Sequence, residues 1–214
     1  MWNRIELKQR GKEAFKKNYL ASVVAAFVMT IVASGSASVG SNATSQEESV
    51  GFILAIGTMA LFLLTIFVFN VLEVGGCRFF LENRTSQPKI SVLISMFRSS
   101  SYVNVVAVQV LRMVKIFLWS LLLVIPGIIK TYEYRMVPYI LSEHPEIEQK
   151  NAFLVSRNMM NGHKMELFIF DLSFFGWFLL AAVTFNIAGI FYTYPYYQAT
   201  MAEVFECSKA NYRM

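Results

Sequence analysis

Residues 111–143 read LRMVKIFLWSLLLVIPGIIKTYEYRMVPYILSE, and this stretch decides the fold. It is apolar on both sides of Pro126-Gly127, too long for one buried helix and too apolar for a soluble loop. Because backbone groups in lipid must be satisfied within the protein, such a stretch predicts membrane-embedded helices. We therefore expect two helices that fold back on each other at a hinge formed by Pro126 and Gly127.

The composition extends this interpretation to the whole chain. Of its 214 residues, 56% are hydrophobic and 15% are charged, whereas a soluble domain carries about 25% charged residues. We predict one all-α integral membrane domain over residues 1–214, a polytopic transmembrane bundle of about six membrane-embedded helices, one pair being the Pro-Gly hairpin. The spans are expected near residues 19–39, 50–74, 111–125, 128–142, 165–185 and 190–205.

Amphipathic helices should lie beside these spans at the membrane interface. Residues 1–18 predict a basic interfacial helix, with Leu7, Gly11, Ala14 and Phe15 on one face. Residues 90–110 are interrupted by polar side chains, so we expect an interfacial or cytoplasmic helix there rather than a full span.

Basic residues give the orientation. Lys and Arg are abundant before residue 19, in segments 75–98 and 150–164, and after residue 205, but absent from the predicted outer segments 34–49, 126–127 and 186–189. Cytoplasmic loops carry an excess of Lys and Arg. A hairpin at 111–143 keeps all the basic segments on the cytoplasmic side, with both termini there, whereas a single crossing would move Lys150 outside. A deep re-entrant loop remains an alternative to two full crossings.

Several blocks of the sequence are similar to those of a known family. They are the N-terminal R-x-E-L-K at Arg4 to Lys8, G-x-R-F-F at Gly76 to Phe80, the block Phe117 to Tyr132 around P-G-I-I-K, M-x-P-Y-I-L at Met136 to Leu141, S-R-x-x-M-x-G-x-K at Ser156 to Lys164, and D-L-S-F-x-G-W at Asp171 to Trp177. The chain thus resembles a bacterial integral-membrane family of unknown function, number 975, common in Gram-positive bacteria.

The resemblance implies a helical membrane protein of the bacterial cytoplasmic membrane and no established activity. Glu133 and Arg135 stand where small polar residues are usual in the family, so a shared role of that arm does not follow. More loosely, the chain is similar to the membrane region attached to some bacterial glycerophosphodiester phosphodiesterases, which hints at a lipid-side role.

Four ionisable residues are predicted at membrane depth, and they form the candidate polar intramembrane site: Lys130, Glu133, Arg135 and Asp171. Such residues are costly in lipid and often functional. Lys130 and Glu133 are i, i+3 neighbours that could pair. Asp171 could face Lys130, Arg78 or Arg112. The alternatives are a path for an ion or headgroup and a structural lock between helices.

Other charged residues lie near the ends of the spans. Those expected to contact lipid headgroups or a partner are Glu73, Arg78, Arg112, Lys115, Arg157 and Lys164. Glu203 and Glu206 close the last predicted span, and we expect them to contact Arg or Lys of the cytoplasmic helices.

The sequence offers no catalytic set: GxSxG, HExxH and P-loop motifs are missing. Cys77, Cys207, His144 and His163 lack metal-ligand spacing, so we expect neither metal nor cofactor. Basic residues beside apolar runs favour lipid over nucleic acid as the binding partner.

We expect a non-enzymatic accessory or scaffold protein that acts with a membrane partner or in envelope or peptide resistance. The partners would be anionic lipids and either another membrane protein or a second copy. The alternatives are a small transporter or channel and a lipid-binding or lipid-moving protein.

Overall fold

A computed structural model describes residues 3–37, 56–60 and 63–212, and within these ranges every regular element is helical. The elements are α1 (Arg4–Lys17), α2 (Tyr19–Ala37), η2 (Thr65–Phe69), α4 (Asn70–Glu82), η3 (Ile90–Arg98), α5 (Tyr102–Leu122), α6 (Val124–Glu133), α7 (Val137–Glu143), α8 (Gln149–Met159), α9 (Lys164–Leu172), α10 (Phe175–Val183), η4 (Gly189–Thr193) and α11 (Tyr194–Tyr212). The predicted all-α class is confirmed.

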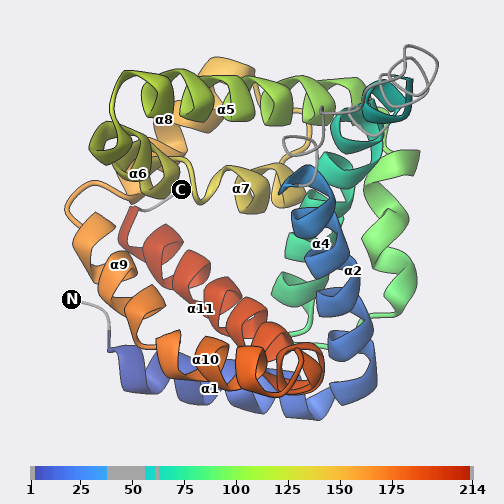
Figure 1. Cartoon of the computed structure of the whole chain (residues 1–214), viewed down its shortest axis with the longest axis vertical. Coiled ribbons are helices and arrows are strands. Elements are labelled where there is room, and N and C mark those ends of the chain that lie inside the picture. The colour runs from blue at the N-terminus through green and yellow to red at the C-terminus, as the bar shows by residue number, and fades with distance from the viewer. Residues whose placement is uncertain (1–2, 38–55, 61–62, 213–214) are drawn as a thin grey trace, which may run out of the picture.

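Helix α11 is the central element of the fold. Figure 1 shows it crossing the middle of the molecule diagonally, with α1 along the lower edge, α2 and α4 at the right and α5 along the top. Most of α11 is buried, from Pro195 to Ser208. Its partly polar sequence therefore faces other helices rather than lipid.

Helix α1 follows its sequence closely. The Asn3 side chain accepts a hydrogen bond from the Glu6 N–H at 3.4 Å, and Lys16 and Lys17 lie in the last turn, as helix capping and the helix dipole favour. The buried residues are Leu7, Gly11, Ala14 and Phe15, the face predicted above. This face packs mainly on α11, so the helix rests on the protein itself.

Within the described ranges, three helical segments are long and apolar enough to cross a membrane: Ile56–Glu82, Tyr102–Leu122 and Lys164–Val183. Residues 19–30 of α2 form a shorter apolar helical stretch. The second predicted span, 50–74, thus extends to Glu82, and its residues 50–55 and 61–62 lie outside the described residues.

The segment 111–143 folds back as predicted, because α5 and α6 pack against each other. The hinge, however, is at Leu123, the extended residue (φ −160°, ψ 146°) that separates the two helices. The prediction of a hinge at Pro126 and Gly127 was therefore wrong. Both residues lie in the first turns of α6, where the lack of a proline N–H is tolerated. Gly127 lies directly against Ser120, so its missing side chain lets the two arms approach closely.

The two arms also differ from the predicted spans. The first begins at Tyr102 instead of residue 111, since residues 102–110 continue into the apolar run as one helix. The second, predicted at 128–142, is broken between α6 and α7 at Tyr134–Met136. The last span was predicted at 190–205. In the structure this region consists of η4 and α11, and α11 continues to Tyr212. The fifth, 165–185, is bent at Ser173 between α9 and α10.

Lys8 links α1 to this bend. Its Nζ donates to the Ser173 carbonyl at 3.1 Å and lies 4.2 Å from the Phe174 ring centroid. Burial, and to a lesser degree the nearby Arg4, lower the pKa of Lys8. The Lys8 ammonium thus donates a hydrogen bond to a carbonyl that would otherwise have no partner where α9 ends.

The segments predicted to be cytoplasmic meet on one side of the molecule. The Gln87 amide donates to the Lys17 carbonyl at 3.2 Å, and Asn18 donates to the Pro88 carbonyl at 3.2 Å. At the other end of the chain, Lys209 Nζ lies 2.6 Å from Glu143 Oε2.

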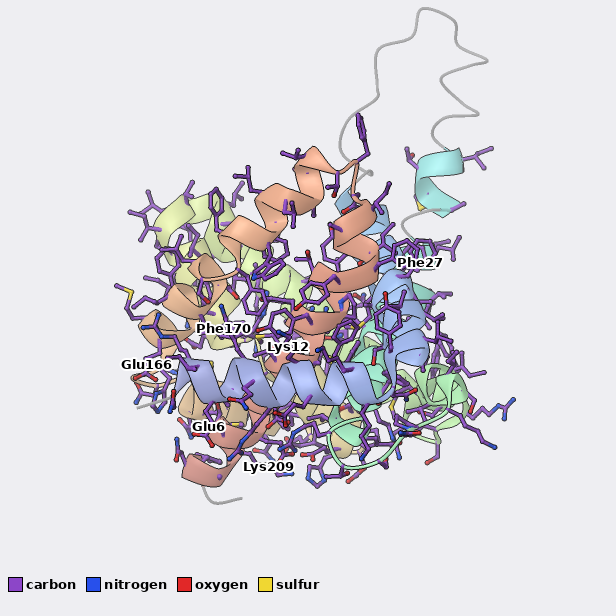
Figure 2. The ribbon with its side chains drawn as sticks, turned by 90° about the horizontal axis from the view of Figure 1, so that it is seen from below. Glu6, Lys12, Phe27, Glu166, Phe170 and Lys209 are labelled. Atoms are coloured by element: carbon purple, nitrogen blue, oxygen red, sulfur yellow. The ribbon has the colours of Figure 1, made fainter. Side chains whose placement is uncertain are left out.

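Figure 2 shows the same separation. Side-chain nitrogen and oxygen gather in its lower part, where Glu6, Glu166 and Lys209 lie, and the upper part around α10 is mostly carbon. The first helix and the end of the last helix therefore lie on one polar side.

Candidate functional site

The four predicted intramembrane charges form two separate networks. The first is centred on Glu133, at the end of α6. Its carboxylate lies 2.8 Å from Lys130 Nζ, 2.8 Å from Lys164 Nζ and 3.6 Å from Arg157 Nε. The Glu133 side chain is only 4% exposed, and the partner cations come from α6, α8 and α9.

The backbone of Glu133 is held as well. Its carbonyl accepts a hydrogen bond from Ser156 Oγ of α8 at 2.7 Å. Lys130 Nζ also lies 5.2 Å from the Trp119 ring centroid, which adds a cation–π contact to α5. This network, which we call the Glu133 cluster, consists of Lys130, Glu133, Ser156, Arg157 and Lys164. It joins α6, α8 and α9, and the contact of Lys130 with Trp119 adds α5.

The second network joins Asp171 to Arg135 through tyrosines. Asp171 accepts hydrogen bonds from Tyr132 at 3.0 Å and from Tyr197 at 2.7 Å. Arg135 Nη2 donates to the Tyr197 hydroxyl at 2.6 Å. The carboxylate and the guanidinium are therefore linked through the Tyr197 hydroxyl of α11. The predicted contacts of Asp171 with Lys130, Arg78 or Arg112 are not formed among the described residues; tyrosines hold it instead.

A cavity of about 370 Å³ lies beside this second network. Its lining comes from α2, η2 and α4 to α7, together with α11, and includes three charged side chains, Glu73, Arg112 and Arg135. Glu73 and Arg112 form an ion pair at 2.8 Å, and Gln109 donates to Glu73 at 3.2 Å. Lys130, Glu133 and Asp171 do not line this cavity.

The remaining predicted contact residues are dispersed. Arg78 pairs with Glu82 one helical turn away at 3.0 Å, with both side chains about 40% exposed. Lys115 Nζ lies 3.6 Å from the Phe153 ring centroid, so it packs on an aromatic ring of α8. Arg157 and Lys164 belong to the Glu133 cluster.

Arg84, which follows α4, forms two ion pairs with the middle of α11. Arg84 Nε lies 2.8 Å from Glu203 Oε1, and Arg84 Nη1 lies 3.4 Å from Glu206 Oε2. This matches the expected contact of the two glutamates with a basic residue.

The sequence did not predict that Tyr197 and Gln109 belong to the polar networks. Tyr197 lies among several tyrosines and carries no distinguishing signal, whereas a glutamine within the apolar run 105–111 could have drawn attention.

The cysteines and histidines are dispersed. Within the described part of the chain, no three His, Cys, Asp or Glu side chains are grouped as a metal ion would require. Cys77 is buried and Cys207 is partly buried, and both are free thiols.

Comparisons with known proteins agree with the motifs. No curated protein and no solved structure gives a match. A family model described as a protein of unknown function, DUF975, matches residues 120–207. These residues include α6 to α10, η4 and most of α11, and with them both polar networks. The family whose model the chain matches is the one that its sequence motifs resemble.

Proposed function

We propose that the chain is a non-enzymatic, polytopic protein of the bacterial cytoplasmic membrane that acts as an accessory or scaffold protein for a membrane partner. The observation that carries this proposal is the Glu133 cluster, in which both oxygens of the Glu133 carboxylate are already paired. An ion path needs groups that can exchange partners with a passing ion, whereas Glu133 already has two cations at 2.8 Å. A buried charge with several fixed partners acts as a cross-link between helices.

The outer surface supports membrane insertion. The α5–α6 hairpin carries a run of large apolar side chains that are more than 60% exposed: Phe117, Leu121, Leu122, Leu123, Val124 and Ile125. A soluble monomer rarely exposes such a continuous apolar patch. This hairpin is suited to lie in lipid or against a transmembrane helix of a partner.

The orientation proposed is both termini in the cytoplasm. It is supported by the hydrogen bonds and ion pairs that bring the basic segments together on one side of the molecule. The positive-inside bias assigns that side to the cytoplasm. A role in envelope or peptide resistance would then depend on the partner.

Two measurements test the accessory role. In proteoliposomes, the purified chain should give no more flux of protons, potassium or sodium than empty vesicles. In cells, a photo-crosslinking amino acid at Leu121 should give one discrete protein adduct, whereas the same substitution at Lys12, on the exposed face of α1, should not. Ion flux that Lys130→Met abolishes would contradict the proposal and favour a transporter or channel. Adducts with lipid alone at Leu121 would argue against a partner at the hairpin.

Lipid binding is the second candidate, and the cavity lined by Arg112 and Arg135 favours it. Its lining combines charged groups with apolar side chains such as Met113, Ile116 and Met201. This combination is typical of sites that orient a ligand by a few polar groups within an apolar surface.

A further inference from the structure

The cavity between α4, α5, α7 and α11 has an imbalance of charge. Two guanidinium groups, Arg112 and Arg135, line it with one carboxylate, Glu73. Arg112 Nη2 lies within 3.0 Å of both carboxylate oxygens of Glu73, so the charges of these two side chains cancel. Arg135 has no carboxylate within ion-pair distance among the described residues; its one hydrogen-bond partner there is the neutral Tyr197 hydroxyl.

The Asp171 carboxylate offsets part of the positive charge of Arg135, but the Tyr197 hydroxyl lies between the two groups. The Tyr197 hydroxyl donates to Asp171 and accepts from Arg135, which fixes the position of the guanidinium. Arg135 has five N–H groups in a planar fork that suits two oxygens of one anion. Only one of the five is used within the described structure. The other N–H groups remain for a ligand in the cavity.

Two more donors in the cavity lining are poorly used. The Nε atom of Arg112 is buried and has no hydrogen-bond partner in the described structure. Asn70 donates to the sulfur of Met113 at 3.3 Å, and a thioether is a weak acceptor. A buried donor without a good partner costs about 1–3 kcal/mol. An oxyanion in this cavity would give the Asn70 amide a stronger acceptor than the Met113 sulfur.

We propose that this cavity is a binding site for a phosphate-type oxyanion, held by Arg135 and Arg112. The volume of about 370 Å³ is within the range of small-molecule sites. The anion could be free phosphate or the phosphodiester of an anionic lipid whose chains follow the apolar part of the lining. This inference concerns a different site from the Glu133 cluster and does not depend on the accessory role.

The test uses the full chain purified in dodecyl maltoside, with isothermal titration calorimetry at constant ionic strength. The probes are inorganic phosphate, short-chain phosphatidylglycerol and short-chain phosphatidylcholine. We expect saturable binding of at least one anionic probe and much weaker binding of the zwitterionic lipid. Binding of phosphate identifies a free oxyanion site, and binding of phosphatidylglycerol alone identifies a lipid headgroup site. No saturable binding of either anionic probe overturns the proposal.

Variants then assign the site. Arg135→Gln should weaken anion binding by about 10- to 100-fold, the equivalent of one or two charge-assisted hydrogen bonds. Gln198→Glu places a carboxylate of nearly the same shape in the cavity lining, next in sequence to Tyr197. It should abolish anion binding while it raises the unfolding temperature, because the new carboxylate replaces the ligand.

The matched control is Arg98→Gln, which removes an exposed positive charge outside the cavity. It should leave the affinity within about twofold of the parent chain, as for a screened surface charge. If Arg135→Gln does not fold, Gln198→Glu decides alone. Unchanged anion affinity in Gln198→Glu, or an equal loss in Arg98→Gln, would show that the anion binds elsewhere and refute the site.

Discussion

Replacing Glu133 by glutamine should destabilise the fold more than any single substitution in an exposed ion pair. The glutamine keeps the shape of the side chain and removes its charge. Lys130 and Lys164, each 2.8 Å from the carboxylate, would then share one neutral amide. One of the two ammonium groups would lose its acceptor.

The magnitude depends on which cation can reach water. Arg157 and Lys164 have side chains 68% and 33% exposed, so their contributions should be close to those of surface pairs, about 0–1 kcal/mol each. The Lys130 side chain is 19% exposed, and a hydrogen bond to a charged group contributes about 1.5–3 kcal/mol. We expect a total loss of about 2–4 kcal/mol, below the upper limit for a fully buried pair. For a chain of this length, that lowers the unfolding midpoint by roughly 4–16 °C.

Thermal unfolding in detergent, followed by tryptophan fluorescence and by recovery of the monodisperse peak, measures this effect. The control is Glu82→Gln, which removes a carboxylate 39% exposed and paired with Arg78 one turn away. That variant should lose less than about 1 kcal/mol. Adding Lys130→Met to Glu133→Gln should restore part of the stability, because it removes the unpaired ammonium. Equal losses in Glu133→Gln and Glu82→Gln would refute the cross-link.

Three further predictions concern packing and orientation. Gly75→Ala should destabilise the fold by about 1–3 kcal/mol, because the new Cβ would collide with the backbone of Leu93. Gly176→Ala is the control: nothing lies within 4 Å of the new Cβ, so this variant should be neutral or slightly stabilising. Thermal unfolding of both variants compares their stabilities. Asn83→Ala should cost about 1–3 kcal/mol in the same assay, since the buried amide donates to the carbonyl of Ala14 at 2.9 Å. A cysteine at Lys150 should react with a membrane-impermeant maleimide only after the cells are opened; labelling in intact cells would contradict the cytoplasmic assignment of the α7–α8 connector.

The sequence predicted best what depends on local spacing and composition. The buried face of α1 followed from the i, i+4, i+7 and i+8 positions of Leu7, Gly11, Ala14 and Phe15. The pairing of Lys130 with Glu133 followed in the same way, because i, i+3 neighbours meet on one helix. The reversal of direction within 111–143 also followed, although its position did not.

The position of the hinge shows why helix ends are harder to predict. Pro126 and Gly127 are the usual helix-breaking residues, but proline is compatible with the first turn of a helix. The break falls instead at Leu123, in the middle of the run LLLVI, where the sequence has no breaker. The close approach of Gly127 to Ser120 indicates that packing between the arms determines the register of α6. Such tertiary packing is not encoded in a local pattern.

The composition of the second polar network was not predictable for a related reason. Asp171 and Arg135 are distant in sequence, and the residue that joins them, Tyr197, is on a third helix. An aspartate in an apolar run indicates that it needs a partner, but not which one. Tyrosines supply hydroxyls that suit both charges, so the chain can hold an acid and a base apart without a direct ion pair.

The distribution of unsatisfied polar atoms connects these networks to the cavity. Among the described buried side chains, the atoms without a hydrogen-bond partner are Asn83 Oδ1, Gln109 Oε1 and Arg112 Nε. Gln109 and Arg112 are one turn apart on α5, and both contact Glu73, which lines the cavity. Native interiors pair nearly all such atoms, so the two unpaired atoms beside Glu73 are a local cost of the contact between α4 and α5. The Glu133 cluster, in contrast, has every carboxylate oxygen paired. The bundle therefore contains charges with two different roles: the Glu133 cluster joins helices, and Arg135 keeps N–H donors free beside the cavity.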